Sequence, residues 1–83
     1  MNLYKDLITL KPNPIKSTAV LDLTGRFAGG KDISIYAVSG ILRRIWNTSE
    51  DVVHLDLSFL EAGMYILKAA DPEMIIVIKF IKE

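Results

Sequence analysis

Residues 33–46, ISIYAVSGILRRIW, decide the fold of this chain. Two apolar runs of period two, residues 33–38 and 41–46, are separated only by Ser39-Gly40. Alternation of apolar and polar side chains over a short run is typical of a half-buried strand. Glycine adopts positive φ at little cost, as a tight hairpin turn requires. The stretch therefore predicts two antiparallel strands joined at Ser39-Gly40.

The same period recurs along the whole chain, broken by turn residues. The predicted strands are residues 3–10, 18–23, 33–38, 41–46, 52–57, 64–70 and 74–81. Pro12 and Pro14 cannot donate a ladder hydrogen bond, so the first strand must end before them. Loops are expected at residues 25–32 and 47–51 and a turn at Asp71-Pro72, whereas residues 58–62 allow one helical turn at most. The pattern otherwise shows neither a helical stripe nor the strand–helix–strand spacing of a parallel sheet.

Alternation also assigns faces to the strands. The residues that share a face on four strands are Ala19, Leu21 and Leu23; Ile33, Ile35 and Ala37; Val53, Leu55 and Leu57; and Tyr65, Leu67 and Ala69. Short, regularly spaced and half-buried strands predict an all-β, Ig-like antiparallel sandwich of about seven strands. Tyr65, two residues after Gly63, stands where the tyrosine corner of such sandwiches bonds its hydroxyl back to the main chain.

The last run, residues 74–81, is apolar on both faces apart from Lys79. It is either a central strand covered on both sides, or a strand whose face or edge is offered to a partner. A long apolar edge invites strand addition. Lys79, Lys82 and Glu83 are then the charges that limit unwanted pairing.

Composition narrows the class of protein. The 83 residues fit one domain, and 51% of them are hydrophobic. Without cysteine, and with a single histidine, neither disulfides nor a structural zinc site are expected. Ten basic residues balance ten acidic ones, so the net charge does not favour binding to nucleic acid. No stretch has the length of a transmembrane segment or the pattern of a signal peptide, so the chain is either cytosolic or a piece of a larger protein.

No catalytic constellation emerges, and no cofactor is expected. His54 has no second ligand nearby in sequence and is interpreted as a solvated strand histidine. The glycines of residues 25–30 lack the Lys-Ser/Thr tail of a phosphate-binding loop. Asp22 and Asp56 could be cross-strand neighbours, but nothing in the sequence places them at acid–base separation. Trp46 is either a core residue or a surface anchor, and we expect it in the core.

Four segments, taken in order, resemble one family. They are LKPNP at residues 10–14, ISIYAVSG at 33–40, LDLS at 55–58 followed by LEAGMYILK at 60–68, and IKFIKE at 78–83. This order is similar to that of the type A C-terminal sorting domain of the type IX secretion (Por secretion) system, found on exported proteins of Bacteroidetes. Lys11 and Ala37 depart from the pattern, where an aromatic and a polar residue are common.

The resemblance implies a non-catalytic export signal at the end of a larger cargo, with Met1 then an artificial start. The outer-membrane translocon would recognise the folded domain in the periplasm, and sortase components would attach the cargo to the cell surface, or the cargo would be released. Residues 1–9 would be a linker or first-strand region and residues 10–83 the domain. The motif positions carried over are Pro12, Asn13, Pro14, Gly40, Gly63, Tyr65, Lys79 and Lys82. Of these, Lys79 and Lys82 are predicted to contact the machinery directly, with association at a strand edge as one mode.

A second hypothesis comes from another class of protein. A sandwich of this kind also serves as an Ig-like or fibronectin-like accessory module of a secreted enzyme, which binds carbohydrate or protein. Trp46 and Tyr36 would then be the aromatic platforms on which a sugar stacks.

Overall fold

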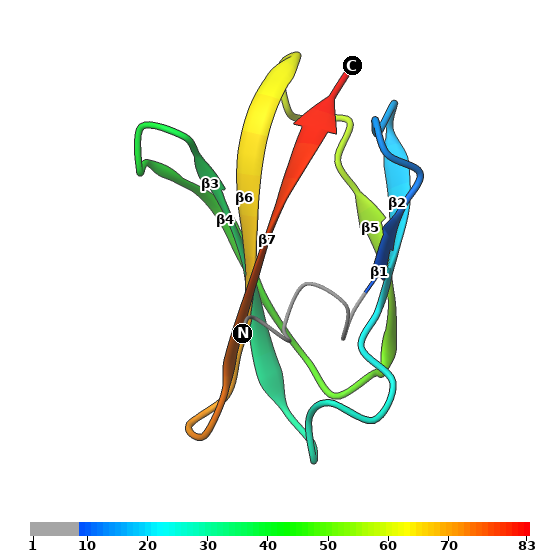
Figure 1. Cartoon of the computed structure of the whole chain (residues 1–83), viewed down its shortest axis with the longest axis vertical. Coiled ribbons are helices and arrows are strands. Elements are labelled where there is room, and N and C mark those ends of the chain that lie inside the picture. Colours follow the sequence, from blue (N-terminus) through cyan, green and yellow to red (C-terminus); the bar gives the residue numbers. More distant parts are fainter. Residues whose placement is uncertain (1–8) are drawn as a thin grey trace, which may run out of the picture.

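The computed structural model describes residues 9–83, which form seven strands (Figure 1). The strands are β1 (Thr9–Lys11), β2 (Thr18–Asp22), β3 (Lys31–Ala37), β4 (Leu42–Thr48), β5 (Val52–Asp56), β6 (Gly63–Ala70) and β7 (Ile75–Lys82). β1 ends directly before Pro12, as predicted. The rest of the first predicted strand, residues 3–8, lies outside the described residues.

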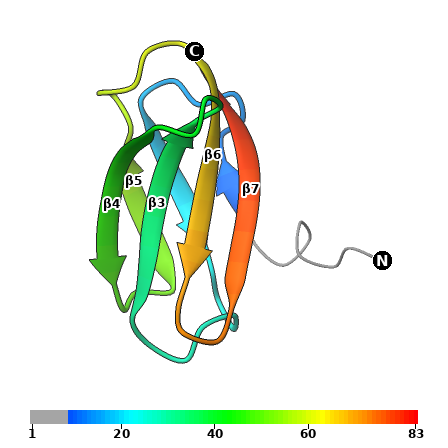
Figure 2. The same cartoon turned by 90° about the vertical axis from the view of Figure 1, so that its left-hand side faces the viewer.

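The strands form two antiparallel sheets packed face to face. One sheet has the order β1-β2-β5 and the other the order β4-β3-β6-β7 (Figures 1 and 2). The core between them is almost entirely aliphatic. It consists of Ile15, Ala19, Leu21, Leu23, Phe27, Ile33, Ile35, Val53, Leu55, Leu57, Leu60, Tyr65, Leu67, Ala69, Ile76 and Phe80. The predicted all-β sandwich is confirmed, and so are the faces assigned from alternation.

The β3–β4 hairpin forms at Ser39-Gly40, as predicted. The Gly40 N–H donates to the Ala37 carbonyl (2.9 Å), and the Ala37 N–H donates to the Ile41 carbonyl (2.9 Å). Gly40 has a φ of 92°, a conformation that glycine adopts without the Cβ penalty of other residues. This residue therefore permits the tight turn between the two strands, whose register shifts once, between Ile35 and Tyr36.

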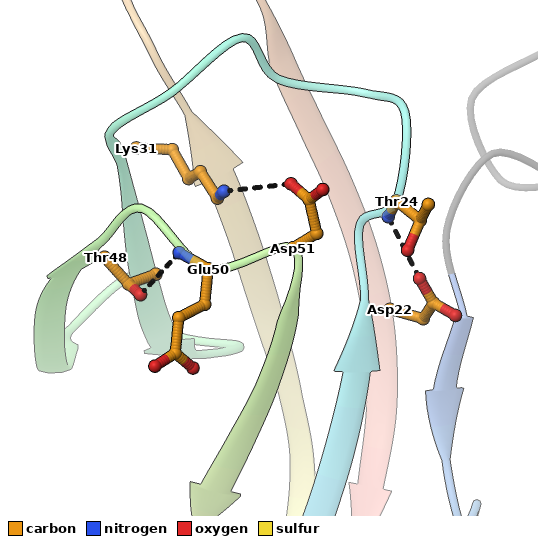
Figure 3. Close-up of polar contacts among 6 residues, drawn as sticks. All are labelled: Asp22, Thr24, Lys31, Thr48, Glu50 and Asp51. Carbon is orange, nitrogen blue, oxygen red and sulfur yellow. Dashed lines mark hydrogen bonds and ion pairs between the residues drawn. The ribbon is translucent and has the colours of Figure 1, made fainter.

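β3 begins earlier than predicted, because it includes two residues assigned to the preceding loop. Lys31 points into the sandwich and is only 1% exposed. Its ammonium nitrogen lies 3.7 Å from a carboxylate oxygen of Asp51 (Figure 3). The same nitrogen lies 6.0 Å from the centre of the Phe27 ring. It has no hydrogen-bond partner among residues 9–83. The long aliphatic stem of a lysine can fill an apolar position in this way.

β7 is the edge strand of the four-stranded sheet, so of the two alternatives the central strand is wrong and the strand with an open edge is correct. Ile76 and Phe80 point into the core and are buried. Ile75, Val77 and Ile81 alternate with them and are 58%, 49% and 46% exposed. The apolar residues on the second face of β7 are thus covered by nothing within residues 9–83.

Candidate functional site

The segment Pro12-Asn13-Pro14 carries the chain from one sheet to the other. β1 belongs to the three-stranded sheet, whereas Ile15 forms a parallel bridge to Lys82 of β7. The Ile15 N–H donates to the Ile81 carbonyl, and the Glu83 N–H donates to the Ile15 carbonyl, both at 2.8 Å. The two prolines suit the crossing because it needs no ladder donors. The motif therefore covers the end of β7 and places Ile15, fully buried, between the sheets.

Tyr65 forms the predicted tyrosine corner at the same end of the sandwich. Its hydroxyl donates to the Glu61 carbonyl (2.7 Å), and its ring stacks on Phe80 with centroids 5.7 Å apart. Gly63, two residues earlier, pairs with Lys82 across the β6–β7 ladder. The tyrosine therefore ties the β5–β6 connection to the strand that ends the domain.

Removing the Tyr65 hydroxyl tests this corner. We expect Tyr65→Phe to lower the free energy of unfolding by about 0.5–1.5 kcal/mol, because the partly buried hydrogen bond to the Glu61 carbonyl is lost. Urea denaturation of the purified domain measures the change. Tyr36→Phe is the control, on a half-buried ring outside the core, with an expected change within about 0.5 kcal/mol. Equal losses in the two variants would contradict the role of the corner.

The motif residues therefore converge although the sequence scatters them. Pro12–Pro14, Gly63, Tyr65 and Lys82 meet around the last residues of β7, where the C-terminus lies (Figure 1). The Gly40 hairpin reaches the same end, because Ala37 pairs with Tyr65. We call this region the C-terminal end of the sandwich. Lys79 lies further along β7, opposite Ile66.

The two lysines predicted as direct contacts differ in exposure. Lys79 points outward and is exposed. Lys82 is only 7% exposed, and its ammonium donates to the Glu83 carbonyl (3.0 Å). A direct contact needs an exposed side chain, so the geometry favours this role for Lys79 over Lys82. A strand that is apolar on both faces does not reveal from its sequence which lysine points inward.

The outer face of the four-stranded sheet was not singled out by the motifs. Apolar side chains from four strands surround two lysines there. We define this two-lysine face by Tyr36, Ile45, Met64, Ile66, Lys68, Ile75, Val77, Lys79 and Ile81. The sequence signal for it is the second set of alternate residues on β6 and β7, which is apolar where a solvated face would be polar.

Asp22 and Asp56 lie on paired strands but are not cross-strand neighbours. Asp22 pairs with Val52 and Asp56 with Thr18, at opposite ends of the β2–β5 ladder. His54 lies between them on the exposed face of β5, as expected for a solvated histidine. No group of three or more potential metal ligands gathers within residues 9–83.

Each of the two aspartates instead closes a turn after its own strand. The side-chain and main-chain hydrogen bonds from Thr24 lower the pKa of Asp22 below its usual value (Figure 3). Asp56 likewise accepts bonds from the Ser58 hydroxyl (2.7 Å) and N–H (3.0 Å), which lower its pKa. Their arrangement serves local structure, because both carboxylates are committed to turn donors.

Trp46 and Tyr36 do not form one aromatic platform. Trp46 is half-buried at the margin of the core, where Phe59 packs against its edge and the Arg44 guanidinium lies 5.2 Å from its ring centre. Tyr36 points to the other side of the sheet, with the Lys68 ammonium 5.4 Å from its ring centre. Each ring already has a cation over it, so the geometry does not favour a sugar-stacking module. Trp46 packs on the core without being fully buried.

The fold and its motifs define a class of small β-sandwich domain built for recognition. No helix within residues 9–83 has the length and apolar character needed to cross a bilayer. The sequence matches the family described as the secretion system C-terminal sorting domain over residues 9–83, so the chain belongs to that family. A comparison with curated proteins gives no match. The chain is therefore a type IX secretion sorting signal, a kind of domain that does not catalyse a reaction.

Proposed function

We propose that the folded sandwich directs an N-terminal cargo from the periplasm through the type IX outer-membrane translocon. Sortase components then attach the cargo to the cell surface, or the cargo is released. The observation that carries this proposal is the family match over residues 9–83, together with the convergence of its motif residues at the C-terminal end. Pro12, Asn13, Pro14, Gly40, Gly63 and Tyr65 act by shaping the recognised surface. Lys79 is the proposed direct contact, and Lys82 stabilises the end of β7.

The experiment is an export assay with a reporter. A signal peptide, a folded reporter and residues 1–83 are fused in that order and expressed in a type IX-competent bacterium. We expect the reporter outside the outer membrane, and in the periplasm of a strain without the translocon. A reporter without the domain is the control for leakage. Retention of the full fusion in the periplasm of competent cells would refute the proposal.

A further inference from the structure

The outer faces of the two sheets differ in character. The face of β2 and β5 is mixed, with Thr18, Asp22, His54 and Asp56 among its exposed residues. The two-lysine face instead exposes Ile45, Met64, Ile75, Val77 and Ile81. A contiguous apolar surface on a small soluble domain usually marks a binding site.

The two lysines lie in the middle of this apolar surface. Lys68 pairs with Val77 and Lys79 with Ile66, so the two cations sit diagonally across the β6–β7 ladder. The pair Met64 and Ile81 flanks them on the side of the C-terminal end. Any partner that covers the apolar residues must therefore also cover both ammonium groups.

Neither lysine has an acidic partner on this face. The strands of the four-stranded sheet carry one carboxylate, Asp32, and it accepts a hydrogen bond from the Asn47 amide (2.9 Å). The ion pair recorded within residues 9–83 involves Lys31 and not these lysines. Covering an ammonium without a counter-charge is costly, so the covering surface needs its own carboxylates.

We propose that the two-lysine face docks on a protein surface of the export machinery whose carboxylates are set among apolar side chains. The inference rests on the proposed function. Charge complementarity selects this occupant over a second copy of the domain, because two such faces would bring four ammonium groups together.

Charge reversal in the reporter fusion tests the proposal. We expect Lys68→Glu with Lys79→Glu to lower export at least about tenfold, through repulsion from the partner's carboxylates. The control adds two negative charges at exposed loop positions off this face and outside the motifs, Ala28→Glu with Ser49→Glu, and its export should stay within about twofold. Thermal melting of each purified domain checks folding. If the glutamate pair fails to fold, Lys68→Gln with Lys79→Gln replaces it, and its export should still fall.

The outcomes separate this inference from the function on which it rests. If the unaltered fusion is not exported, the proposed function fails. If the unaltered fusion is exported and the folded charge variants are exported equally well, only the docking face is overturned. If the purified domain sediments as a dimer and Lys79→Glu dissociates that dimer, the face binds a second copy of the domain. Co-sedimentation with phosphatidylglycerol vesicles that is lost on charge reversal would assign it to a lipid surface, and both results overturn the proposal.

Discussion

Replacing Phe80 with alanine lowers the free energy of unfolding by about 3–5 kcal/mol, the usual cost of deleting a buried aromatic ring. Phe80 is 2% exposed and stacks on Tyr65, whose hydroxyl holds the β5–β6 connection. The total free energy of unfolding of a natural domain is about 5–15 kcal/mol, so the variant approaches the limit of stable folding. Urea denaturation followed by circular dichroism measures the loss.

The neighbouring residue supplies the control for this prediction. Ile81 lies next to Phe80 but points outward, so Ile81→Ala should cost less than about 1 kcal/mol. Similar losses in the two variants would show that the inward and outward faces of β7 are wrongly assigned. The comparison also helps to interpret the export assay, because a loss of export in the Phe80 variant would report unfolding and not lost recognition.

Replacing Ile15 with alanine should cost about 2–5 kcal/mol, because the side chain is fully buried where the chain changes sheets. The adjacent Lys16 is exposed, and its replacement by alanine should change stability by less than about 0.5 kcal/mol. Amide hydrogen exchange gives a second measurement, since the Glu83 N–H donates to the Ile15 carbonyl. We expect that amide to exchange faster in the Ile15 variant. Unchanged protection of Glu83 would contradict the idea that this crossing secures the end of β7.

Much of the fold could be predicted because alternation and turn chemistry are local. The faces of β2, β3, β5 and β6 follow from a period of two, and Gly40 alone indicates the hairpin. The exceptions have physical causes. Lys31 reads as a loop residue because a charge is normally solvated, yet its stem fills a core position. The edge position of β7 is a property of strand order, which the hydrophobicity of a strand does not encode.

The candidate site could be predicted only in part. The order of motifs indicated the family, and the tyrosine corner followed from Gly63 and Tyr65. Convergence at the C-terminal end depends on the bridge between Ile15 and Lys82, which joins residues far apart in sequence. The two-lysine face depends on registers across four strands, so it became visible only once the strands were ordered.

Thr9, where the first described strand begins, and Glu83 lie near opposite ends of the sandwich. Thr9 pairs with Asp22, at the end of β2 farthest from Thr18, whereas Glu83 bonds to Ile15 near the other end. All described strands begin at Thr9 or later. A cut of the chain before Thr9 would therefore leave all seven described strands and their pairings in one piece.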